Sequence, residues 1–226
     1  MRLLLIALAF APLTAAALDE DIQFIGAGVY SHPKFDGSTA QHNDAIPEVH
    51  FIHRPWFIRT TEGILEGGAR WGVGQHAAIG VQAAYEDGPR GEHPGPSLGI
   101  HAEIEGQIGP APVSSVFRIR QFTTNGKGWE ADARVNLGVY EGHGWGLALY
   151  GQATWASDKI FNNFYAVNDS GLLFTALGAW GGYEIAPKWL FLFSAEDRRL
   201  GDTAAPSPFV ERRSGFYGSL GIAYRL

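Results

Sequence analysis

Apolar and polar residues alternate one by one along most of the chain beyond its N-terminal segment. The clearest case is "WEADARVNLGVY" (129–140), where small or apolar residues occupy every second position and charged or polar residues lie between them. "LGIHAEIEGQI" (98–108) and "WGLALYGQATW" (145–155) repeat this pattern. Because successive side chains of a β-strand point to opposite faces, the pattern predicts strands with one apolar and one polar face. No segment after residue 17 sustains an apolar period of 3.6 residues, so we expect an all-β fold.

Turn signals divide the chain into antiparallel strands. Counted back from the C-terminus, eleven strands are obvious, and an odd number would leave the two chain ends on opposite sides of a closed barrel. Dividing residues 45–73 at "HRP" and "TTEG" into three short strands gives twelve, with ten as the alternative. Short turns are expected at "HRPW", "VGQH", "GPAP", "EGHG" and "IAPK", and longer loops at "SHPKFDGSTAQHND", "DGPRGEHPGPS", "SDKIFNNFYAVNDSG" and "LGDTAAPSPFVERR". Alternation of short turns with long loops is typical of a barrel whose two ends face different compartments.

The apolar face has two explanations, the core of a soluble antiparallel barrel or the lipid-facing surface of an outer-membrane barrel. Trp145 and Trp155 lie on one face, ten residues apart. At ~3.4 Å per residue and a tilt of about 40°, they are separated by roughly 26 Å along the barrel axis, which matches the ~25 Å lipid-facing band between two aromatic girdles. We therefore predict an antiparallel transmembrane β-barrel of the outer-membrane type. Its girdle is expected to contain Trp129, Trp145, Trp155, Trp189 and Tyr224.

The N-terminus has the pattern of a cleaved secretory signal peptide, residues 1–17. Arg2 precedes an apolar run from Leu3 to Leu13, and small residues follow up to Ala17. This run is shorter than the ~20 apolar residues that a membrane-spanning helix needs. Residues 18–226 are then expected to form a single barrel domain. The chain has no cysteine, and export without disulfides fits a bacterial envelope.

The amino-acid composition limits the classes of partner that the protein is expected to bind. Removing Arg2 with the signal peptide leaves 16 Lys and Arg against 23 Asp and Glu, a formal charge of −7. This acidic balance argues against nucleic acid. The chain has 30 Gly, 7 Trp, 8 Tyr and 14 Phe against a single Met, which favours strands and girdles in contact with outer-membrane lipid.

The polar face carries charges of both signs. A turn at 109–112 would place Glu103 opposite Arg118 and His101 opposite Arg120, and the next strand would bring carboxylates to the other side of both arginines. Such a network either fills and rigidifies the interior, since buried charges persist only when paired, or forms a constriction in a pore. The expected lumen charge network comprises His101, Glu103, Glu105, Arg118, Arg120, Glu130, Asp132, Arg134, Glu196 and Arg198.

The first and last long loops become neighbours when a barrel closes. We expect residues of both loops to pack into one ordered surface, because prolines lower the entropy lost on ordering. The alternative is that these residues serve their own turns alone. They are Pro33, Phe35 and Gly37 in the first loop and Asp202, Ser207 and Pro208 in the last.

Candidate chemistry is sparse. His50 and His53 are three residues apart, which on a strand puts them on opposite faces and argues against a metal pair. We expect neither metal nor cofactor. The enzyme hypothesis is an acyl-hydrolase that uses a Ser and a His at the lipid-facing rim. Ser31, beside His32, and Ser170 are expected in loops, where serine is an ordinary turn residue.

Three segments carry a family resemblance. "GAGVYSHPKFDGS", "TWASDKIFNNFYAVNDSGLL" and "RRLGDTAAPSPFV", followed by the terminal "IAYRL", resemble in that order the recurring segments of the MltA-interacting protein family, also called the MipA/OmpV family. The resemblance extends over essentially all of residues 18–226. It implies a non-enzymatic outer-membrane barrel that acts as a scaffold between two partners, a murein-degrading lytic transglycosylase and a murein-synthesising penicillin-binding protein. A small-solute pore through the charged lumen is the alternative.

Overall fold

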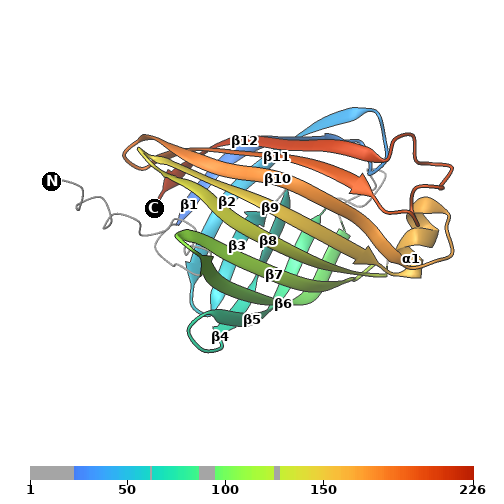
Figure 1. Ribbon diagram of the computed structural model, residues 1–226, viewed down its shortest axis with the longest axis horizontal. Coiled ribbons are helices and arrows are strands. Elements are labelled where there is room, and N and C mark those ends of the chain that lie inside the picture. The colour runs from blue at the N-terminus through green and yellow to red at the C-terminus, as the bar shows by residue number, and fades with distance from the viewer. Residues whose placement is uncertain (1–22, 62, 87–94, 125–127) are drawn as a thin grey trace.

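The computed structural model describes residues 23–61, 63–86, 95–124 and 128–226, so the expected signal peptide lies outside the described residues. Twelve antiparallel strands form one closed barrel, which β1 closes by pairing with β12 (Figure 1). The predicted fold class and strand number are confirmed, and the ten-strand alternative is wrong. The strands are β1 (Phe24–Pro33), β2 (Gln41–His53), β3 (Trp56–Thr61), β4 (Ile64–Gly72), β5 (Ala77–Glu86), β6 (Gly95–Ile108), β7 (Ala111–Phe122), β8 (Trp129–Gly142), β9 (Trp145–Ala156), β10 (Gly171–Ala186), β11 (Trp189–Leu200) and β12 (Ser214–Arg225).

The two ends of the barrel differ. At one end, here called the short-turn end, β2, β4, β6, β8 and β10 are each joined to the next strand by two to four residues. The connections after β1, β3, β5, β7, β9 and β11 lie at the opposite, long-loop end. The segment after β9 contains α1 (Asp158–Ile160) and the π-helix η3 (Phe161–Tyr165). Figure 1 shows α1 at the end opposite to the C-terminus.

Some expected loop residues belong to strands or helices. Ser31 pairs with Asn43 and His32 with His42, so the ladder between β1 and β2 continues to Pro33. The expectation that Ser31 and His32 lie in a loop is therefore wrong, because the strands continue beyond the stretch of clear alternation. The helical turns after β9 are too short to show a 3.6-residue apolar period.

The apolar positions of the strands face outward. Trp129, Trp145, Trp155, Trp189 and Tyr224 are all exposed on this face. Trp145 stacks on Tyr183 at 4.5 Å, and Trp189 meets Tyr224 edge-on at 5.3 Å, both at the short-turn end. No helix among the described residues is long and apolar enough to cross a membrane.

Candidate functional site: the barrel lumen

Charged side chains of both signs meet inside the barrel on the wall formed by β3 to β8. Arg118 donates from Nε to Asp132 at 2.8 Å and lies 3.4 Å from Glu66. Arg120 contacts Asp132 at 3.3 Å and Glu130 at 3.5 Å. Each guanidinium therefore faces two carboxylates, from β8 alone for Arg120 and from β8 and the more distant β4 for Arg118, which provides the pairing that buried charges require.

The pairing between β6 and β7 differs from the expectation. Arg118 lies opposite His101, and Arg120 lies opposite Gly99. The predicted pairs of Glu103 with Arg118 and of His101 with Arg120 are wrong, because the strands are joined by two residues, Gly109 and Pro110, and a shorter turn shifts the register by two.

Charged residues of β3 and β4, which were not among the expected lumen residues, complete this network. Arg59 of β3 contacts Glu66 at 2.5 Å and Glu103 at 3.0 Å, and Arg70 of β4 contacts Glu103 at 3.1 Å. The sequence contains a signal for them: Arg59 in "FIRTT" and the pair Glu66 and Arg70 in "EGGAR" are charges at positions that can share the polar face of a strand. We call the network of β3 to β8 the charge network; it consists of Arg59, Glu66, Arg70, His101, Glu103, Arg118, Arg120, Glu130 and Asp132.

Three other expected lumen residues, Arg134, Glu196 and Arg198, lie around Tyr150 on β8, β9 and β11. The Arg134 guanidinium lies over the Tyr150 ring at 3.6 Å, and the Tyr150 hydroxyl donates to Glu196 at 2.7 Å. Arg198 donates to Glu196 at 2.8 Å. Glu105 also faces the lumen, opposite Ser114. Apart from Glu105, the expected residues thus have contacts either within the charge network or around Tyr150 and Glu196.

Most of these charges are out of reach of water. Glu66 is 1 % exposed and Arg118 3 %. The charge network is therefore packed away from water, and its ion pairs can hold the strands in register as well as narrow the lumen.

An apolar cluster lies at the long-loop end. Ile160 of α1 and Phe161, Phe164 and Tyr165 of η3 are buried, with Phe161 at 0 % exposure. Burying each such side chain stabilises by about 1.5–3 kcal/mol. The helical segment is thereby packed on the long-loop ends of β7, β9, β10 and β11. Its partners in the cluster are Phe122, Ala156, Leu173, Phe174, Ala176, Leu200 and Ala204.

The first and last loops contact each other beside this cluster. The Gly37 carbonyl accepts the backbone N–H groups of Glu211 and Arg212, both at 2.9 Å. Gly37 has a φ of +103°, which favours glycine. Thr39 donates from its amide and its hydroxyl to the Glu211 carboxylate, and these bonds hold the pKa of Glu211 below its usual value.

The expected loop residues have different surroundings. Pro33 is buried at the end of β1, and Ser207 is buried with its hydroxyl accepting the Phe209 N–H at 3.2 Å. Asp202 is exposed and contacts Arg213 at 2.6 Å. Phe35 is half-buried and Pro208 exposed. Contacts within and between the loops explain the positions of several of these residues without a catalytic role.

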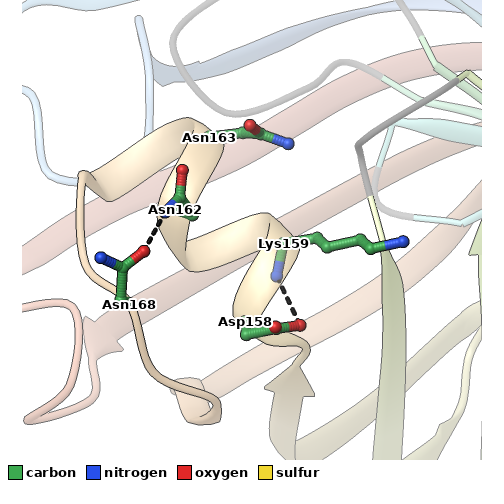
Figure 2. A pocket seen from close by; sticks show the side chains of 5 residues that line it. All are labelled: Asp158, Lys159, Asn162, Asn163 and Asn168. Carbon is green, nitrogen blue, oxygen red and sulfur yellow. Dashed lines mark hydrogen bonds between the residues drawn. The ribbon is translucent and has the colours of Figure 1, made fainter.

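A pocket of about 320 Å³ lies on the outer surface of the helical segment (Figure 2). Two hydrogen bonds join residues of its lining. The Lys159 N–H donates to Asp158 at 2.8 Å, and Asn162 donates to Asn168. The lining consists of Asp158, Lys159, Asn162, Asn163 and Asn168.

Two serine and histidine positions bear on the enzyme hypothesis. Both ring nitrogens of His32 are engaged, Nδ1 with the Pro33 carbonyl at 2.7 Å and Nε2 with Asp44 at 2.8 Å, so His32 has no nitrogen left for a serine hydroxyl. Ser97 lies in a G-x-S-x-G stretch, 95–99, that the sequence reasoning passed over. It is buried inside β6, whereas a nucleophile elbow exposes its serine at a strand-to-helix turn.

Toward the short-turn end, part of the lumen is open to water. In β8 to β12, inward residues near the long loops, such as Asp132, Thr154 and Phe174, are buried, whereas Asn136 and Trp180 are partly or largely exposed. Smaller or packed inward residues near the short turns are still buried, namely Ala148, Leu190 and Ala223. We call this open part of the lumen the vestibule. The exposed and half-exposed side chains that border it are Phe24, Asn136, Trp180, Glu184, Leu192, Ser194, Ser219 and Arg225.

Comparisons with known proteins agree with this architecture. A family model described as MltA-interacting protein MipA matches residues 25–226. No curated protein matches. The NanC porin structure superposes with a TM-score of 0.59 at 10 % identity, covering 88 % of this chain and 100 % of that chain. The translocator domain of autotransporter NalP from Neisseria meningitidis gives 0.52 at 10 % identity (94 % and 91 %), and LpxR from Salmonella typhimurium 0.50 at 7 % (89 % and 100 %). At these identities the likeness concerns the fold alone.

Proposed function

The chain belongs to the MltA-interacting protein MipA family, and from this premise we propose that it is a non-enzymatic scaffold for murein enzymes in the bacterial cell envelope. The barrel lies in the outer membrane, where short turns face the periplasm and long loops face outward. The short-turn end is therefore periplasmic and the long-loop end extracellular.

One observation supports the proposal most strongly: an apolar cluster packs at the extracellular end, whereas inward side chains of the vestibule reach water toward the periplasmic side. Murein and its enzymes lie in the periplasm, so partners meet the short turns and the vestibule. The proposed partners are a lytic transglycosylase and a penicillin-binding protein. The first and last loops lie at the other end, and we assign them to closing the barrel.

Co-purification from envelopes treated with an amine-reactive crosslinker tests the scaffold. Lys188 lies in the short turn between β10 and β11, whereas Lys34 and Lys159 lie at the extracellular end. We expect a lytic transglycosylase to co-purify, with a lower yield from a Lys188→Arg control that keeps the charge and loses the amine. Repeated absence of every murein enzyme would count against the scaffold.

A small-solute pore is the second candidate, favoured by the charged lumen. Because the buried charge network narrows the lumen, we expect the purified protein to be silent in planar bilayers. Stable unitary steps that change on Glu103→Ala or Arg118→Ala would favour the pore, with the charge network as its constriction.

A further inference from the structure

The wall of the vestibule carries a carboxylate with no counter-charge. Glu48 of β2 is 9 % exposed and faces inward beside Gly26 of β1. Among the described residues, no side chain or backbone group forms a hydrogen bond or an ion pair with this carboxylate. By contrast, the arginines nearby are paired: Arg70 with Glu103 at 3.1 Å, and Arg225 with Glu184 at 3.5 Å.

The neighbouring strands leave room for the Glu48 side chain. A Cβ on Gly28 would lie 2.9 Å from the Glu48 Oε1 atom, and one on Gly221 would lie 2.8 Å from its Cγ atom. Two glycines on neighbouring strands therefore leave the space that the side chain occupies. A carboxylate held in this way without a partner is costly in the free protein, and a ligand that brings positive charge offsets that cost.

An aromatic face lies on the same wall. Trp180 of β10 faces inward, because it pairs with Ser194, and it is 40 % exposed. Its Nε1 donates to the Asn136 Oδ1 atom at 3.4 Å, and no described aromatic ring stacks on it. Its inward neighbours on β10 are Gly178, whose space the Tyr150 ring occupies, and Gly182, and the indole keeps its exposed face toward the vestibule.

Two hydroxyls lie between the indole and the carboxylate. Ser194 pairs with Trp180 on one side and with Ser219 of β12 on the other, and the two serine oxygens are 2.8 Å apart. Gly221, against which Glu48 lies, is the next inward residue after Ser219. The wall thus presents in a row an aromatic face, two hydroxyls and an anion.

We propose that the vestibule binds an elongated organic cation, with Glu48 as the counter-ion of one ammonium or guanidinium group and Trp180 as the aromatic face for another. Aromatic rings attract such cations, most strongly when they are desolvated. The serine oxygens can accept N–H groups from the chain between the two charges. This site does not depend on the scaffold, since a cation can bind whether or not murein enzymes do.

Isothermal titration of the purified protein in detergent micelles with spermidine tests the proposal. We expect saturable binding that Glu48→Gln weakens about tenfold or more, because a hydrogen-bonded charge pair is lost. Trp180→Leu is expected to weaken it about threefold or more. Glu211→Gln and Trp155→Phe, at the outer rim and on the lipid face, are matched controls expected to leave binding unchanged.

A second variant keeps the test independent of folding defects in the first. Gly221→Ala retains the charge of Glu48 but displaces its side chain, and it is also expected to weaken binding. A lysine-containing tetrapeptide, titrated alongside spermidine, distinguishes a partner's side chain from a free amine, and binding of either supports the site. Absence of binding, or equal binding by the wild type and by Glu48→Gln and Trp180→Leu, overturns the proposal. Preferential binding of a neutral disaccharide of N-acetylglucosamine that depends on Glu48 and Trp180 would also overturn the proposal.

Discussion

Arg118 illustrates how single residues keep charge inside this barrel. The alternation of "VFRIRQF" was enough to predict that Arg118 and Arg120 face the lumen. It could not give their partners, because a partner depends on the strand register, and a two-residue change in one turn moves every cross-strand pair. The sequence does predict that carboxylates of the next strand, such as Asp132, lie beside Arg118, but not that Glu66 does, which is two strands farther away in the sheet than His101.

We predict that Arg118→Met lowers the free energy of unfolding by about 3–5 kcal/mol, because it leaves the Asp132 and Glu66 carboxylates short of a counter-charge. Urea unfolding in micelles measures this loss. Arg212→Met, on an exposed loop, is the control, and its effect should stay within about 0.5 kcal/mol. Adding Asp132→Leu to Arg118→Met should recover part of the stability. Equal losses for Arg118→Met and the control would contradict the pairing.

Glu211 is expected to make the contact between first and last loops sensitive to pH. Its pKa is lowered in the folded protein by the Thr39 hydroxyl and amide, so the carboxylate stabilises the fold fully above its ordinary pKa of about 4.3. That contribution is lost as the pH falls through the lowered value. Thermal unfolding should therefore separate the wild type from Glu211→Gln at neutral pH, and the gap should close in acid. A gap independent of pH would show that the ionised carboxylate is not responsible.

At the scale of elements, the strands could be predicted and the helical segment could not. Period-two alternation persists over many residues in β6, β8 and β9, and even the short β3 and β4 follow from parity. The segment "SDKIFNNFYAV" shows no such period. Its conformation depends on how Ile160, Phe161 and Phe164 pack against the apolar end of the barrel. Tertiary packing, rather than local propensity, determines this segment.

Phe161→Ala is predicted to destabilise the protein by about 3–5 kcal/mol, since it leaves a cavity in the apolar cluster. Asn162→Ala, the next residue but exposed, serves as the control and should have little effect. Urea unfolding compares the two variants directly. Similar stabilities would mean that Phe161 does not hold the helical segment on the barrel.

At the scale of the whole molecule, the barrel is asymmetric. Its sequence predicted the closed twelve-strand barrel and the two unequal ends, since both follow from alternation and turn spacing. It did not predict which end holds the apolar cluster, because that depends on how the side chains of distant strands pack in the lumen. The extracellular apolar cluster, the buried charge network and the periplasmic vestibule all support a protein that acts toward the periplasm.

Site-specific photocrosslinking in intact cells tests the scaffold most directly. A photoreactive residue replaces His143 or Lys188 in the periplasmic turns, and Lys159 or Asp202 at the extracellular end provides the control positions. We predict that mass spectrometry identifies a lytic transglycosylase crosslinked to the periplasmic positions and none at the controls. Failure to find any murein enzyme at the periplasmic positions, or the same products from both ends, would contradict the proposed scaffold.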